Sequence, residues 1–212
     1  MNYAVNAKIR AMRATALENI FPQHEQSYDD FIQRETKRIL PYLKKNSRDF
    51  VSAWTKNFDA YKALQNLRAL DKPDRDSLRR VFGTEIDLRN ILIIFRLKKF
   101  YGLDGDLIFS FLIPAKYKLN SDDLKNLAHT KNFSQEVANG KYGAVFENNF
   151  EHGEQILSRF VYSQFKKERR RENLAVVCEY LFARRIEIKN LRAKNEGTRL
   201  GLSHEEIFSL LH

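Results

Sequence analysis

Two pairs of polar residues with the same spacing are the strongest candidates for chemistry in this sequence. Asp87 precedes Asn90 by three residues, and Glu187 precedes Asn190 by the same interval. Residues three apart lie on one face of a helix, so both members of a pair can reach the same neighbour. Buried hydrogen bonds from such a pair would fix how the helices pack. Each pair could instead contact another protein.

Structural roles that require no function also fit the two acids. Asp87 lies three residues after Thr84, which is the spacing of a capping box at the start of a helix. Glu187 lies inside an expected helix, where it could pair with Arg184 or Lys194 or be solvated. The sequence alone leaves these alternatives open.

The remaining reactive residues do not form a catalytic or metal-binding pattern. The single cysteine, Cys178, has apolar neighbours and is expected to be a buried thiol in a reducing compartment. A Gly-rich phosphate loop is absent from the sequence, so no nucleotide or other cofactor is expected. The histidines are too scattered for a zinc site: His24, His129, His152, His204 and His212. We therefore expect neither catalysis nor a bound metal.

The formal net charge of +10 predicts a surface that attracts anionic partners. Phosphate-bearing polymers, anionic lipids and acidic protein surfaces all fit this charge, and a basic helical nucleic-acid-binding protein is an alternative function. No zinc finger or other nucleic-acid-reading motif supports that alternative. The densest basic run is a candidate interaction surface or simply solvated: Lys166, Lys167, Arg169, Arg170 and Arg171.

Glycine and proline are sparse, with eight and four residues, and apolar residues recur every three or four positions. This periodicity predicts an all-α fold. One helix is expected from Ser47 to about Leu70, a second from Thr84 to about Tyr101 after a stop at Gly83, and a third from about Glu172 to Asn195. The expected core includes Trp54, Phe58, Leu92, Phe95, Leu181 and Leu191.

Two passages about a hundred residues apart share a pattern that indicates duplication. Each has an acid and Asn on a helix, then a Gly-Leu turn at 102–103 or 201–202, then a short helix reading Ile-Phe-Ser-x-Leu at 108–112 or 207–211. A fainter third copy opens the chain, where Lys8-Ile9-Arg10-Ala11 parallels Asn190-Leu191-Arg192-Ala193.

The same motifs carry a family resemblance. The chain resembles the C/AC39 (or d-type) family of V-type and A-type ATPase subunits, as a shortened member. The matching segments are Tyr3 with Ile9-Arg10-Ala11-Met12, then Asp87, Asn90, Arg96 and Lys98, then Leu112-Ile113-Pro114, Phe150-Glu151-His152, Tyr180-Leu181, Glu187-Ile188-Lys189-Asn190-Leu191-Arg192 and Gly201-Leu202-Ser203-His204-Glu205-Glu206-Ile207.

This resemblance implies a non-catalytic adaptor that couples the rotary shaft to the proteolipid ring. Its partners would be shaft and ring subunits, and it would lie peripherally on the cytoplasmic face of the membrane. It also implies a funnel of helical lobes, expected here at residues 1–83, 84–149 and 150–212. Arg10, Arg96 and Arg192 join the two acid and Asn pairs as candidate lobe-packing or interface residues.

Overall fold

The computed structural model describes residues 3–13, 26–147, 149–169 and 173–212, and every regular element in these ranges is a helix, which confirms the all-α prediction. The α-helices are α1 (Tyr3–Arg13), α2 (Gln26–Ile39), α3 (Lys45–Asn57), α4 (Ala60–Asn66), α5 (Lys72–Tyr101), α6 (Gly105–Ser110), α7 (Ser121–His129), α8 (Phe133–Asn139), α9 (Gly143–Phe146), α10 (Gly153–Glu168), α11 (Ala175–Arg199) and α12 (His204–Ser209). Two short 3-10 helices, Leu40–Tyr42 and Leu67–Ala69, follow α2 and α4.

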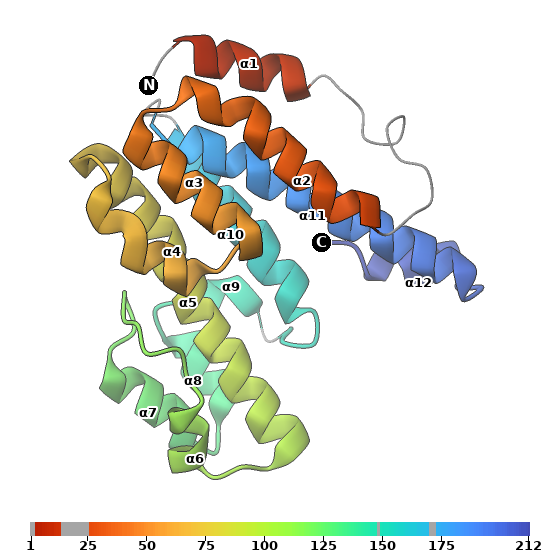
Figure 1. Ribbon diagram of the computed structural model, residues 1–212. Helices are drawn as coiled ribbons and strands as arrows, with labels where there is room; N and C mark the ends of the chain where they lie inside the picture. Colours follow the sequence, from red (N-terminus) through yellow and green to blue (C-terminus); the bar gives the residue numbers. More distant parts are fainter. Residues whose placement is uncertain (1–2, 14–25, 148, 170–172) are drawn as a thin grey trace.

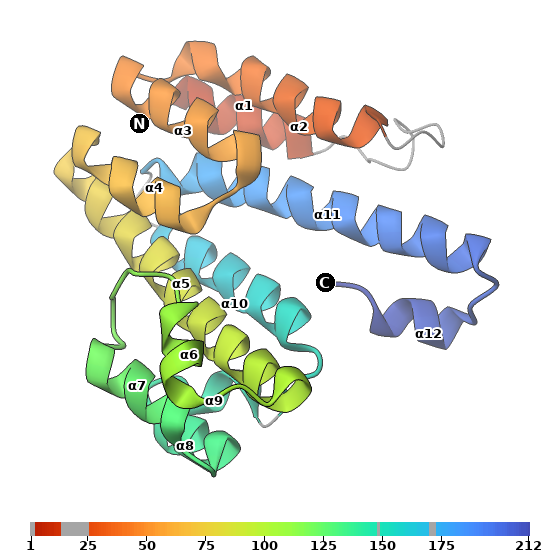
Figure 2. The same cartoon turned by 60° about the horizontal axis from the view of Figure 1, so that its bottom comes forward.

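Two long helices organise the molecule. Helix α5 reaches from α4 to a group formed by α6, α7 and α8, whereas α11 runs beneath α1, α2 and α3 and ends beside α12 (Figures 1 and 2). Helix α10 packs against both. Among the described residues, none of the helices has the length and apolar character needed to cross a membrane.

Aromatic rings join the helices at the centre of the core. The ring centroids of Trp54 and Phe82 are 5.5 Å apart, and those of Phe82 and Phe165 are 5.9 Å apart. The centroids of Phe165 and Phe182 are 5.4 Å apart. These rings come from α3, α5, α10 and α11, so the chain buries one continuous apolar cluster. The predicted core residues belong to it: Trp54, Phe58, Leu92 and Leu181 are buried, and Phe95 and Leu191 pack against it half-buried. Cys178 is buried, as predicted.

The predicted helix from Ser47 to Leu70 is wrong as a single element. Helix α3 ends at Asn57, Phe58 adopts a left-handed conformation with φ 49°, and Asp59 begins α4 by accepting hydrogen bonds from the backbone N–H groups of Tyr61 and Lys62. The break lets the Phe58 ring pack 4.8 Å from Trp54. Apolar spacing continued across the break because both helices present their apolar side to the same core.

The predicted stop at Gly83 is also wrong, since α5 continues through it from Lys72 to Tyr101. A Cβ on Gly83 would lie 2.5 Å from Cγ of Tyr117. Gly83 therefore permits the close approach of the Tyr117 ring and does not end the helix. The division into three lobes remains a proposal, and its first boundary at 83/84 falls inside α5.

Candidate functional site

Asn90 joins the middle of α5 to the segment after α6. Its side-chain oxygen accepts a hydrogen bond from the Ile113 backbone N–H at 2.8 Å, and its amide nitrogen donates to the Ile113 carbonyl at 3.2 Å. Asn90 is fully buried. The asparagine thus satisfies the N–H of a non-helical residue and is a second donor to its carbonyl, which also accepts from the Ala115 N–H at 2.8 Å.

Asn190 makes the same pair of hydrogen bonds in the second passage. Its oxygen accepts from the His212 backbone N–H at 2.7 Å, and its amide donates to the His212 carbonyl at 3.3 Å. This asparagine is half-buried. Each asparagine thus binds the residue that directly follows the Ile-Phe-Ser-x-Leu sequence, and ties the end of a short helix back to its long helix.

The turns between the long and short helices also correspond. Gly102 and Gly201 both have positive φ, 60° and 71°, just after the long helices. Asp104 and Ser203 then cap α6 and α12 by accepting backbone hydrogen bonds. The two passages therefore share a glycine turn, a capping residue and an asparagine bridge, as expected of duplicated units.

The two acids of the pattern differ in environment. Oδ2 of Asp87 accepts hydrogen bonds from the backbone N–H groups of Lys118 and Leu119 at 2.8 and 3.1 Å and from the Tyr142 hydroxyl at 2.8 Å. Burial raises the pKa of Asp87 above its ordinary value, and these hydrogen bonds oppose the rise. Asp87 is thus a buried acceptor inside α5, and the capping-box interpretation is wrong.

Glu187 does not take the corresponding position. Its carboxylate is 47% exposed and pairs with Nη1 of Arg184 at 2.7 Å. This is the local pair that the sequence offered as an alternative.

A buried polar network beside this pair was not identified from the sequence. Nη2 of Arg184 donates to the Met12 carbonyl at 2.5 Å, and Nε of Arg184 donates to the Tyr180 hydroxyl at 3.1 Å. The Tyr180 hydroxyl donates to Glu35. Because Met12 lies on α1 and Glu35 on α2, the network joins both helices to α11. In the sequence, the spacing of Arg184 and Glu187 indicates only their own ion pair. No local pattern predicts that Glu35 joins the network.

The candidate arginines lie on separate helices. Arg96 on α5 pairs with Glu154 at 3.1 Å, and Arg192 on α11 lines a cleft between α2 and α3. The backbone of Arg10 lies in α1, and its side chain falls outside the described residues. The described side chains therefore do not form one shared arginine site.

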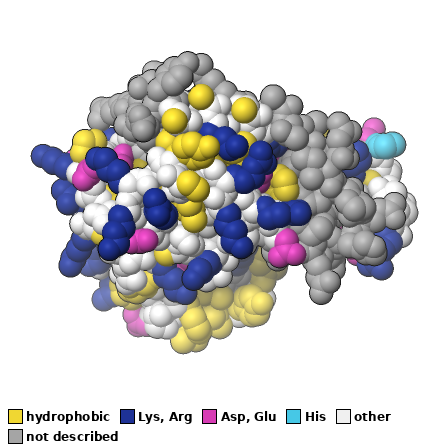
Figure 3. Space-filling model, turned by 45° about the horizontal axis from the view of Figure 1, so that its top comes forward, with side chains coloured by type: hydrophobic (Ala, Val, Ile, Leu, Met, Phe, Trp, Pro, Cys, Tyr) yellow, Lys and Arg dark blue, Asp and Glu magenta, His cyan; other side chains and the backbone are white. Residues whose placement is uncertain are grey.

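The basic run is divided among different contacts. Nζ of Lys166 lies 4.3 Å from the Tyr162 ring centroid, and Arg169 lies 3.6 Å from the buried Glu179 carboxylate. Lys167 is exposed, whereas Arg170 and Arg171 lie outside the described residues. Basic side chains also cover the face seen when the top of Figure 1 is turned forward, with few acidic ones among those described (Figure 3).

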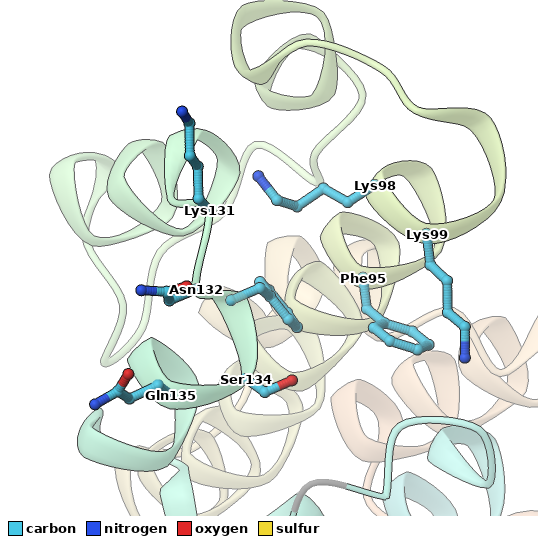
Figure 4. A pocket seen from close by; sticks show the side chains of 8 residues that line it. Phe95, Lys98, Lys99, Lys131, Asn132, Ser134 and Gln135 are labelled. Atoms are coloured by element: carbon cyan, nitrogen blue, oxygen red, sulfur yellow. The ribbon is translucent and has the colours of Figure 1, made fainter.

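A pocket of about 440 Å³ lies between the C-terminal part of α5 and the start of α8. Phe95 and the partly basic wall around it are shown in Figure 4, where Lys98 reaches toward Lys131 and Lys99 points away from both. Two of these cations are already engaged: Lys98 donates to the Ala128 carbonyl, and Lys99 pairs with Glu151 at 2.6 Å. The shallow hollow therefore presents little free charge to a ligand.

The fold and these contacts define a class of protein: a helical scaffold in which polar residues hold together two duplicated units, each made of a long helix, a glycine turn and a short helix. Among the described residues, no cluster of metal-ligating side chains occurs.

The family described as ATP synthase (C/AC39) subunit matches residues 59–210, which is more than two thirds of the chain. The chain belongs to this family and is therefore a V/A-type ATPase subunit, non-catalytic within a complex that is an enzyme. No curated protein and no solved structure matches the chain.

Proposed function

We propose that this protein is the adaptor that couples the rotary shaft to the proteolipid ring, on the cytoplasmic face of the membrane. Family membership gives the complex, and the distribution of exposed apolar side chains supports the docking role. Both supports concern association with other subunits and require no reaction by this chain.

The exposed apolar side chains gather in two places. Seven of the eight large exposed hydrophobic residues described belong to the two duplicated passages. We call them the α6 tip (Phe100, Tyr101, Leu107 and Phe111) and the α12 tip (Leu200, Phe208 and Leu210). The α6 and α12 helices lie at different ends of the molecule (Figure 2). An adaptor needs two such separate contact surfaces.

The exposure at these tips is large for aromatic residues. Phe208 is 74% exposed and Tyr101 is 70% exposed. Burying such a side chain contributes about 1.5–3 kcal/mol, so contiguous exposed groups of this kind mark protein contacts. Asp104 and Ser203, which cap α6 and α12, hold each tip in a defined conformation and reduce the ordering cost of docking.

The body between the tips has the construction that torque transfer requires. Helix α5 has 30 residues and α11 has 25, and α10 packs against both. Close-packed apolar interiors resist deformation, so a load applied at one tip is carried to the other. The two asparagine bridges keep each tip fixed to its long helix.

The experiment is reconstitution with the shaft subunits and the detergent-solubilised ring of the same complex. Tyr101→Ser with Phe111→Ser should weaken one association by at least roughly tenfold, and Phe208→Ser with Leu210→Ser should weaken the other. Tyr42→Ser is the matched control, because Tyr42 is exposed to 43% outside both tips. Unchanged association in both tip variants, or a wild-type chain that binds neither partner, contradicts the proposal.

A further inference from the structure

A cationic cleft lies between α2, the end of α3 and α11, with a volume of about 240 Å³. Four cations line it: Lys56, Arg185, Lys189 and Arg192. The last three are spaced by four and three residues on α11, so they share one face of that helix. Within the described part of the chain, no acidic residue lines the cleft.

Arg185 and Lys189 are the central cations. The Arg185 guanidinium lies 4.7 Å from the Phe58 ring centroid, and Arg185 and Lys189 are each partly shielded from solvent. Among the described residues, neither forms an ion pair within 4.0 Å. Burial lowers the pKa of both groups, and the positive charge of Arg185 lowers the pKa of Lys189 further.

The two acids whose charges act on Arg185 and Lys189 already have other partners. Glu85 and Glu154 act on both cations through space, but Glu85 pairs with Arg89 at 2.6 Å and Glu154 pairs with Arg96 at 3.1 Å. The arginine at position 89 also adds positive charge near Lys189. The cleft therefore keeps an excess of positive charge at a partly desolvated position, where an anion would be attracted strongly.

The size and chemistry of the cleft restrict the ligand. Typical sites for drug-sized ligands occupy about 300–1,000 Å³, so this cleft suits a smaller group. Arginine offers a planar fork of donors that matches phosphate oxygens, and lysine adds a compact charge. The Gln33 amide donates to the Thr55 carbonyl at 3.2 Å, which fixes the opposite wall.

We propose that this cationic cleft binds a multiply charged phosphate group, either of a small phosphoanion such as pyrophosphate or of a phosphorylated lipid headgroup. Arg185 and Lys189 make the main contacts, and Lys56 and Arg192 border the site. The site is independent of the docking role proposed above, because none of the residues that line the cleft belongs to the α6 tip or the α12 tip. Failure of either proposal leaves the other intact.

The first experiment is calorimetric titration of the full chain with pyrophosphate at low and at physiological salt. Arg185→Gln with Lys189→Gln should weaken binding by at least about tenfold, since two charge-assisted contacts are lost. Lys45→Gln with Lys131→Gln is the charge-matched control, because both lysines are exposed outside the cleft. Arg185→Lys should retain part of the affinity.

A second set of titrations identifies the source of the phosphate. Vesicles containing phosphatidylinositol phosphates are compared with neutral vesicles and with a polyglutamate peptide. Cleft-dependent binding of pyrophosphate or of the phosphoinositide vesicles supports the proposal, and the tighter of the two names the source. Equal loss in the cleft and control variants, cleft-dependent binding of polyglutamate alone, or no binding of any probe overturns it. Thermal melting checks that the variants fold. We expect Arg185→Gln with Lys189→Gln to fold normally, because the two substitutions break no ion pair among the described residues.

Discussion

Asn90 and Asn190 occupy equivalent positions in two duplicated units: each makes two hydrogen bonds with the backbone of one residue just beyond its short helix. The two bridges span 23 and 22 residues. They differ in burial, since Asn90 is fully buried and Asn190 is half-buried. The same contact should therefore contribute differently to stability in the two units.

Replacing Asn90 by Ala should lower the free energy of unfolding by about 2–3 kcal/mol, because the Ile113 N–H loses its partner and the Ile113 carbonyl keeps only the Ala115 N–H. Asn190→Ala should cost less, about 1–2 kcal/mol, since water can replace part of its contact. Urea denaturation measures both. Asn126→Ala, at an exposed position of α7, is the control and should change stability by less than about 0.5 kcal/mol. Equal losses at positions 90 and 126 would contradict the bridging role.

Asp87 should make stability depend on pH. Its folded-state pKa is raised above the ordinary value of 3.8, chiefly by burial. Between these two pKa values the native state binds more protons than the unfolded state, so the contribution of Asp87 is fully present below about pH 3.8 and is lost as the pH rises through the folded pKa.

Asp87→Asn removes this titration, so its free energy of unfolding relative to the wild type should rise with pH across that window. Tyr142→Phe removes a hydrogen bond that lowers the pKa of Asp87, and should therefore extend the window upward. Urea denaturation at a series of pH values measures both effects. A pH-independent difference between the wild type and Asp87→Asn would show that Asp87 does not titrate in this way.

Gly83→Ala tests why a glycine lies inside α5. Alanine favours an isolated helix by about 1 kcal/mol, but the new Cβ would lie 2.5 Å from the Tyr117 ring. Overpacking should dominate and destabilise the protein by about 1–3 kcal/mol. The double variant Gly83→Ala with Tyr117→Ala should be less destabilised than the sum of its single variants. Thermal denaturation measures the set, and strict additivity would argue against the steric explanation.

The sequence predicted those features that depend on local spacing. Apolar periodicity identified the all-α class, and the Gly-Leu repeat located both duplicated turns, whose glycines adopt positive φ. The short helices α6 and α12 follow these turns, as the Ile-Phe-Ser-x-Leu pattern predicted. These features need only a few neighbouring residues to form.

Features that depend on contacts between distant segments were missed. The Phe58 ring, at the break between α3 and α4, lies 4.7 Å from the Arg185 guanidinium of α11, and the tolerance of Gly83 inside α5 follows from Tyr117, 34 residues further along the chain. Asp87 has a capping-box spacing, yet its partners come from positions 118, 119 and 142. Side chains brought together by tertiary packing leave no fixed spacing in one sequence.

Arg184 should be the residue that holds α1 most firmly to α11. It donates to the Met12 carbonyl on α1 and contacts Tyr180, whose hydroxyl binds Glu35 on α2. Arg184→Gln leaves this buried network incomplete, so we expect a loss of about 3–5 kcal/mol. Arg199→Gln is the matched control on the same helix, because Arg199 is exposed and its pair with Glu196 should contribute less than about 1 kcal/mol.

The location of the loss distinguishes this role from general destabilisation. Hydrogen exchange in Arg184→Gln should accelerate first in α1 and in the facing part of α2, while the α5 core around Asn90 stays protected until global unfolding. The contact to Met12 predicts this order, because α1 loses its buried hydrogen bond to α11. Uniform acceleration across α1 and α5 would mean that Arg184 supports the whole core and does not specifically anchor α1.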